Sequence, residues 1–288
     1  MRGIISLPDS RKLSYIDIGD KKGKVVLYFH GVPSAAEEWN MWGDDQIISK
    51  LGIRLIVIDR PGVGLSSFYS NRRISDWAKD IEHFADTLEI EKFSVLGYSG
   101  GGPYAAVCAA LIPERLRSVG LISSVVSFDN GKLLEGLNQG NVQFLNLAIQ
   151  KPRLFRFIYR QIGLLGKFAP KQYLKRALST FEAVDAEVFQ TSKVHNAIFS
   201  VKGSAKGQQL DTKLILSPWD FDLKKIQIPV YIWQEGRDHN ASPAMGRYLN
   251  REISKSTMNF LPEEGHISLI VNNIEHILKK IVDSEYNE

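Results

Sequence analysis

The chain has 288 residues, of which 44% are hydrophobic, and its formal net charge is +4. This length is ample for the core of one large α/β domain or two modest ones. The small charge and the lack of a nucleic-acid motif argue against nucleic acid as a partner. The single cysteine, Cys108, excludes an intrachain disulfide. No segment approaches the length of a membrane span and the first residues lack an apolar export signal, so we expect a cytoplasmic protein.

The first half of the chain alternates β-branched runs with helical patterns, which is typical of parallel strands joined by crossover helices. The expected strands are residues 13–18, 24–29, 54–58, 93–96 and 116–122. Between the third and fourth of them, Trp77, Ile81, Phe84 and Leu88 recur at helical spacing. This pattern predicts a helix that covers the sheet.

After about Ser127 the alternation stops, and the chain as far as about Asp220 indicates helices without a strand. Strands are expected again at residues 229–233 and 257–261, followed by a closing amphipathic helix at about 272–282. The expected organisation is therefore a core made of residues 1–126 and 221–288. Residues 127–220 are expected to form an inserted helical cap.

An apolar run near the middle of the chain ends in Gly97-Tyr98-Ser99-Gly100-Gly101. The G-x-S-x-G spacing is typical of a nucleophilic serine in a sharp strand-to-helix turn, where glycines keep side chains off the neighbouring backbone. A glycine and serine turn can also be simple loop chemistry. We interpret Ser99 as the nucleophile, which then needs a base, an acid and amide donors for the oxyanion.

His266 is the expected base, because it follows a strand in a glycine-containing turn that presents the imidazole at the same sheet end as Ser99. An imidazole titrates near neutrality and can accept and return a proton within one reaction cycle. His83, His195 and His276 fall in helical or cap segments. We interpret these three as surface or packing residues.

Asp238 is the expected acid, because it ends a strand that runs into a glycine turn, where a carboxylate can orient the imidazole. Glu235 lies too close to the strand to be preferred. Asp129, shortly after the strand at residues 116–122, remains an alternative. Asp238 can also cap the helix that begins near Pro243.

The run Phe29-His30-Gly31-Val32-Pro33 also follows an apolar strand. We expect the amides of Val32 and Gly100 to point at the developing oxyanion. His30 either supports this loop or is simply a buried polar residue. The later turn at residues 59–66 lacks the lysine and the spacing of a phosphate loop, so we interpret it as structural.

Taken in order, the segments at residues 30–33, 59–66, 97–101, 236–238 and 265–266 resemble the α/β-hydrolase fold family. The resemblance covers nearly the whole chain outside the cap. It implies an α/β fold with an eight-stranded, mostly parallel sheet and a helical cap over the catalytic pocket. It also implies that Ser99 is the nucleophile, His266 the base and Asp238 its acid, with an oxyanion hole formed by Val32 and Gly100.

Within that family, a serine at this turn disfavours haloalkane dehalogenases and epoxide hydrolases, which have aspartate there. Proline iminopeptidases have a longer oxyanion loop and a tryptophan after the serine, whereas this chain has Gly100. Carboxylesterases, carbon-carbon bond hydrolases, cofactor-free haloperoxidases and lactonases share the motifs that remain. The core motifs do not separate these four classes.

The expected cap is strongly basic, because residues 150–180 contain eight lysines and arginines and no acidic residue. One interpretation is an amphipathic lid whose aromatic face lines an acyl pocket and whose basic face meets acidic lipid or an anionic substrate. The simpler interpretation, a solvated helix face, is the one we expect, since salt screens such charges.

The sequence therefore predicts a serine hydrolase that cleaves small or medium carboxylic esters through an acyl-enzyme on Ser99. The expected partner is a small ester or acyl substrate, and no metal or organic cofactor is needed. The alternative from another class is a ligand-sensing protein that keeps the fold and the three residues but turns over little substrate.

Overall fold

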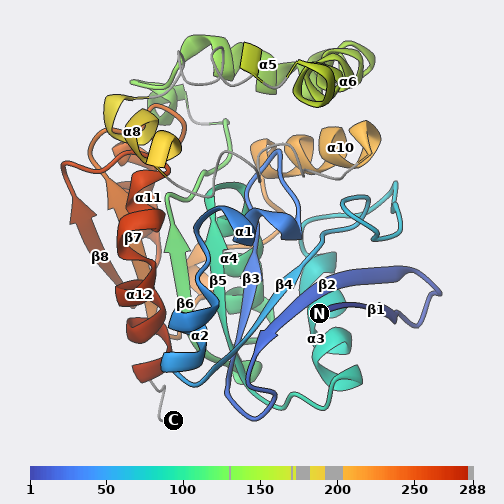
Figure 1. The fold of residues 1–288 in the computed structure, drawn as a ribbon, viewed down its shortest axis with the longest axis vertical. Coiled ribbons are helices and arrows are strands. Elements are labelled where there is room, and N and C mark those ends of the chain that lie inside the picture. Colours follow the sequence, from blue (N-terminus) through green and yellow to red (C-terminus); the bar gives the residue numbers. More distant parts are fainter. Residues whose placement is uncertain (130, 170, 173–181, 192–203, 285–288) are drawn as a thin grey trace.

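The computed structural model describes residues 1–129, 131–169, 171–172, 182–191 and 204–284 (Figure 1). Its centre is an eight-stranded sheet in the spatial order β1-β2-β4-β3-β5-β6-β7-β8. The strands are β1 (Arg2–Ser6), β2 (Lys12–Gly19), β3 (Lys24–Phe29), β4 (Ile53–Ile58), β5 (Phe93–Tyr98), β6 (Leu116–Ile122), β7 (Val230–Glu235) and β8 (Ser256–Leu261). β2 is antiparallel to its neighbours β1 and β4, and the other pairs are parallel. The predicted fold class is confirmed.

β1 is the strand that the sequence pattern does not indicate. It has five residues, and only Ile5 among them is buried. Without an apolar run or a clear alternation of apolar and polar residues, the sequence of such an edge strand cannot be distinguished from that of a loop. β1 pairs with β2 from Arg2 opposite Ile16 to Ser6 opposite Lys12. This pairing, and not a pattern in its own sequence, makes the segment a strand.

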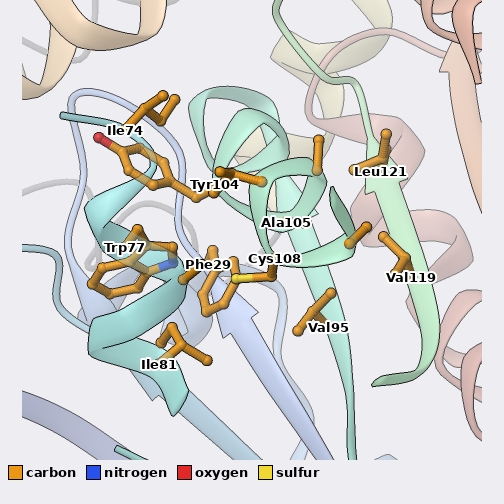
Figure 2. Packing of buried hydrophobic residues seen from close by; sticks show 14 of the residues in the cluster. Phe29, Ile74, Trp77, Ile81, Val95, Tyr104, Ala105, Cys108, Val119 and Leu121 are labelled. Atoms are coloured by element: carbon orange, nitrogen blue, oxygen red, sulfur yellow. The ribbon is translucent and has the colours of Figure 1, made fainter. Parts of the chain in front are cut away.

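Helices cover both faces of the sheet and enclose two apolar clusters. The first face is covered by α3 (Asp76–Thr87), α4 (Gly102–Leu111) and α11 (Pro243–Glu252), and the second by α1 (Trp39–Trp42), α2 (Asp45–Lys50) and α12 (Ser268–Asp283). Figure 2 shows Phe29 of β3 beside Trp77 of α3, whose rings meet edge to face at 5.4 Å between centroids. Cys108 lies buried and free in the same cluster, as expected of a small hydrophobe.

Between β6 and β7 the described residues form helices and no strand, as the sequence indicates. These helices are α5 (Gln139–Gln150), α6 (Pro152–Phe168), α8 (Ala183–Thr191) and α10 (Ala205–Leu216). Figure 1 shows α5 and α6 as the layer farthest from the sheet, with α10 between them and the strands. The cap limits at residues 127 and 220 stay a prediction, and His195, Lys175 and Arg176 lie outside the described residues. In the described part of the chain, no helix is long and apolar enough to cross a membrane.

A buried charge network joins α10 to the core. The Asp211 carboxylate accepts hydrogen bonds from Arg60 at 2.8 Å, from Arg72 at 2.5 Å and from the Tyr104 hydroxyl at 2.6 Å. Burial opposes the charge of this carboxylate, but the two guanidinium groups hold the pKa of Asp211 well below its ordinary value. Arg60 also donates to the carbonyl oxygens of His30 and Gly31. The network therefore connects the inserted helices to the loop after β3.

Replacing Asp211 with alanine should leave two buried guanidinium groups without their carboxylate. Breaking a buried pair in this way costs about 3–5 kcal/mol of the free energy of unfolding, which chemical denaturation can measure. The control is Asp86→Ala, which removes the exposed carboxylate of an ion pair with Arg115 and should change stability little. Equal losses in the two variants would contradict a structural role for the network.

Candidate active site

The turn between β5 and α4 holds Ser99 in an unusual backbone conformation, with φ of +51°. Ser99 begins the short helix η2 (Ser99–Gly101), and glycine is required nearby because the backbone is crowded. A Cβ at Gly101 would lie 2.0 Å from the carbonyl oxygen of Phe29, and a Cβ at Gly97 would lie 2.5 Å from that of Gly101. Only glycine fits these two positions, as the G-x-S-x-G spacing predicts.

Three side chains that are far apart in sequence form one hydrogen-bonded chain here. The Ser99 Oγ lies 3.1 Å from the His266 Nε2, and the His266 Nδ1 lies 2.7 Å from the Asp238 Oδ2. All three residues are buried, with exposed fractions of 7%, 8% and 2% for Ser99, His266 and Asp238. The arrangement can move a proton from a serine hydroxyl to an imidazole that a carboxylate orients.

The structure places the other candidates for base and acid elsewhere. His83 is half-buried in α3, and His276 is exposed on α12. Asp129 is exposed and lines a different cavity of about 190 Å³, beside Trp219 and Tyr248. Of the described candidates, Asp238 is therefore the aspartate that meets His266.

Burial and charge act in opposite directions on this pair. Burial alone would lower the pKa of His266, but the Asp238 carboxylate and its hydrogen bond raise that pKa well above the ordinary value. Burial would likewise raise the pKa of Asp238, but attraction to His266 and the hydrogen bonds it accepts lower it. Those bonds include the amides of Asn240 at 2.6 Å and Ala241 at 3.0 Å. Asp238 is thus held as the ionised partner.

Glu235 is a second buried carboxyl group beside the imidazole. Its closeness to the strand disfavours it as the acid in the sequence. Its Oε1 lies 3.5 Å from the His266 Nδ1, and its Oε2 accepts a hydrogen bond from the Ser123 hydroxyl at 2.9 Å. Burial, and then repulsion from the Asp238 carboxylate, raises the pKa of Glu235 well above its ordinary value. A neutral Glu235 lets the negative charge stay on Asp238.

The predicted amide donors lie next to each other. A Cβ at Gly100 would be 3.2 Å from the backbone nitrogen of Val32, so these two residues flank the same space. In the part of the chain that the structure describes, the Val32 amide donates no hydrogen bond. Gly100 lies in the first turn of η2, where amides have no partner within the helix. Two such donors beside a serine can stabilise an oxyanion.

Glu38 fixes the shape of the loop before Val32. Its two carboxylate oxygens accept from the Gly31 amide at 2.9 and 3.0 Å, and one of them accepts from the Tyr28 hydroxyl at 3.0 Å. Burial raises the pKa of Glu38 to about 7. His30 is also fully buried, with its Nδ1 2.9 Å from the Gly31 carbonyl oxygen, and burial lowers its pKa well below the ordinary value. A neutral His30 therefore packs inside this loop.

Asp185 of α8 reaches the backbone immediately after His266. Its Oδ1 accepts hydrogen bonds from the amides of Ile267 at 3.0 Å and Ser268 at 2.8 Å. Asp185 is 2% exposed, and a Cβ at Gly265 would lie only 2.5 Å from its carboxylate. No sequence signal near His266 could have indicated this contact, because Asp185 belongs to the inserted helices.

The described residues contain one group of acids and histidine close enough to hold a metal ion. The ligand atoms of Glu235, Asp238 and His266 lie within 4.8 Å of one another. The same His266 and Asp238 atoms bond each other at 2.7 Å, and the second imidazole nitrogen bonds Ser99. The geometry therefore fits proton transfer between these side chains.

Comparison with known proteins identifies the family. Residues 24–273 match the alpha/beta hydrolase fold, and the chain belongs to that family. An esterase from Exiguobacterium antarcticum superposes with a TM-score of 0.72 at 19% identity, over 99% of this chain and 100% of the esterase. At that identity the likeness shows the fold alone.

Two of the relatives that are similar in sequence illustrate the range of the matches. A non-heme chloroperoxidase from Streptomyces lividans is 32% identical over 127 residues, which cover 43% of this chain and 45% of the relative, so the match spans under half of that protein. The uncharacterized hydrolase YcgS from Bacillus subtilis is 24% identical over 272 residues, covering 90% of this chain and 89% of the relative. The second of these two relatives is named a hydrolase, without a stated substrate.

The rate at which a fluorophosphonate labels Ser99 should rise with pH, because only a neutral imidazole can accept the serine proton. Asp238 raises the pKa of His266, so the midpoint of this rise should lie above about 6.5, the ordinary histidine value. The Asp238→Asn variant should move the midpoint to lower pH and slow labelling by about 10⁴-fold. An unchanged midpoint would contradict the role given to Asp238.

Removing the Asp185 carboxylate should disturb the backbone that carries His266. Asp185→Ala leaves two buried amides without an acceptor, which costs about 1–3 kcal/mol of the free energy of unfolding and should slow labelling of Ser99. Asp185→Asn is the matched control, since its amide oxygen can still accept both bonds. If the two variants have the same free energy of unfolding and the same labelling rate, the hydrogen bonds from Asp185 do not hold the backbone after His266 in place.

Proposed function

We propose that this protein is a serine hydrolase that cleaves small or medium carboxylic esters through an acyl-enzyme on Ser99. The observation that carries the proposal is the chain of hydrogen bonds from Ser99 through His266 to Asp238, at 3.1 and 2.7 Å. A serine oxygen becomes a nucleophile when an oriented imidazole takes its proton. The membership in the alpha/beta hydrolase fold family supports the same chemistry.

In the proposed first half-reaction, the Ser99 Oγ attacks the ester carbonyl carbon while its proton passes to the His266 Nε2. The carbonyl oxygen takes up negative charge and accepts hydrogen bonds from the amides of Val32 and Gly100. The carbon–oxygen bond to the alcohol then breaks, and His266 gives its proton to the departing alcohol. Asp238 stabilises the imidazolium during this interval and is not itself protonated.

In the second half-reaction, water takes the place of the alcohol. His266 removes a proton from the water, whose oxygen attacks the acyl carbon of the intermediate. The bond to the Ser99 Oγ breaks, the proton returns to that oxygen, and a carboxylic acid is released. Residues of this chain carry every proton, so the proposal invokes no cofactor.

One consideration favours an ester over other acyl compounds, within the classes that share these motifs. A serine nucleophile, an imidazole and two amide donors suffice for an ester, which needs no further acid or activating group. The structural likeness to an esterase covers 99% of this chain, although it establishes only the fold. Lactonase, carbon-carbon bond hydrolase, haloperoxidase and aminopeptidase activities remain the alternatives.

The test is hydrolysis of p-nitrophenyl acetate and p-nitrophenyl butyrate by purified protein. Ser99→Ala should lower the rate by about 10⁴-fold or more, because the nucleophile is gone. The control, Ser49→Ala, changes an exposed serine of α2 and should leave the rate unchanged. Mass spectrometry should map a fluorophosphonate adduct to Ser99.

Two results would overturn the proposal. Ester hydrolysis that survives in Ser99→Ala would remove the proposed nucleophile. Slow turnover of every ester, together with tight binding of a small molecule, would instead favour a ligand-sensing protein with the same fold.

A further inference from the structure

Helix α6 exposes an apolar stripe on the outermost layer of the molecule (Figure 1). The exposed fractions are 41% for Leu154, 60% for Phe157, 48% for Leu164 and 74% for Phe168. These positions follow one another at helical intervals, so they lie on one face, together with the exposed Gln161. An exposed apolar patch of this kind marks an interaction surface.

A basic stripe runs along the same helix beside the apolar one. Arg153, Arg160 and Lys167 are exposed and recur every seven residues, which places them on one line. Arg153 and Lys167 each directly precede an exposed apolar residue. Arg160 lies about one turn from Phe157 and from Leu164. Helix α6 contains no acidic residue at all.

The surrounding sequence concentrates positive charge on this part of the chain. Residues 136–181 contain eight lysines and arginines and no aspartate or glutamate. Since the whole chain has a net charge of only +4, the remaining residues are net negative. The positive charge is therefore a local property of this segment of the sequence, and α6 with its apolar stripe lies within the segment.

The opposite face of α6 is the one that holds the helix in place. Phe155 is fully buried and stacks on Phe144 of α5 at 4.9 Å between ring centroids. The ring of Tyr159 lies nearly parallel to that of Phe155 at 6.1 Å. Packing within the cap therefore uses Phe155 and Tyr159, and Phe157 points outward instead of lining an acyl pocket. Leu154, Phe157, Leu164 and Phe168 remain exposed on the other side of the helix.

We propose that α6 docks the inserted helices onto an anionic lipid surface, and not that it is the purely solvated face expected from the sequence, because exposed apolar side chains lie beside its charges. A helix with Leu and Phe on one face and Lys and Arg beside them lies in the membrane interface, with the apolar side chains among the acyl chains and the cations at the lipid phosphates. The helix lies on the surface and does not span the bilayer. This inference concerns surface binding alone and does not depend on the chemistry of Ser99.

A lipid surface fits the stripe better than a second copy of the chain does. A two-fold dimer through α6 would bring two basic stripes with no acidic residue between them to the same interface, and such like charges repel. An anionic bilayer supplies both a negative surface and an apolar interior. Binding should weaken as salt rises, because its electrostatic part is screened.

The experiment is sedimentation of the full chain with vesicles. We expect binding to vesicles of phosphatidylcholine mixed with phosphatidylglycerol, and much weaker binding to phosphatidylcholine alone. Each cation near an anionic surface contributes about fivefold in affinity. Combined Arg153→Gln, Arg160→Gln and Lys167→Gln substitutions should therefore weaken binding by about 100-fold.

The control removes the same charge from other elements. Lys22, Lys79 and Lys225 are exposed residues outside the inserted helices, and replacing all three with glutamine should leave vesicle binding nearly unchanged. A second variant, Phe157→Ser with Phe168→Ser, should also weaken binding by removing the apolar anchors. A thermal transition that is unchanged from that of the natural protein establishes that each variant is folded.

Three outcomes would overturn the proposal. The first is the absence of binding to the anionic vesicles, and the second is equal weakening in the cap and control variants. The third is a dimer in solution that the Phe157→Ser and Phe168→Ser variant converts to a monomer, which would make the stripe a self-association surface. Binding to the anionic vesicles by a chain that hydrolyses no ester would contradict the proposed function and still support this inference.

Discussion

The close approach of Gly101 to the backbone of β3 is the constraint on which the site depends. Because no side chain separates the start of α4 from the carbonyl groups of Phe29 and His30, the turns after β3 and β5 come into direct contact. This contact places Gly100 beside Val32 and leaves Ser99 in the left-handed region, with its hydroxyl directed to His266. A larger residue at position 101 would separate the two turns and therefore Ser99 from the Val32 amide.

The inserted helices hold the loops of the site from the other side. Asp211 binds Arg60, which binds the carbonyl oxygens of the loop after β3, and Asp185 binds the amides after His266. Asn141 of α5 donates to Asn240, two residues after Asp238. Each loop that contributes a site residue from β3, β7 or β8 is therefore bonded, directly or through Arg60, to a helix of the insertion. The helices between β6 and β7 thus stabilise the arrangement of these loops.

The sequence was sufficient to place Ser99, His266 and Asp238 at one edge of the sheet, because parallel strands end at the same edge and each residue follows an apolar strand. It was not sufficient for the residues that surround them. Glu235 is disfavoured as too close to the strand, but its position along the chain cannot show that its carboxyl group lies 3.5 Å from the imidazole. Asp185 and Asp211 bind residues that are far away in the sequence, and the spacing of residues does not predict such contacts. The sequence pattern does not predict β1, because pairing with β2 and not an apolar pattern makes this segment a strand.

The buried Glu38 has a thermodynamic consequence for the whole domain. Burial raises its pKa from 4.5 to about 7, so between these values the folded protein holds a proton that the unfolded chain has lost. By linkage, this one group makes the folded state less stable as the pH increases across that interval, and its unfavourable contribution is complete above it. Keeping Glu38 as the acceptor for the Gly31 amide therefore lowers the free energy of unfolding in alkaline solution.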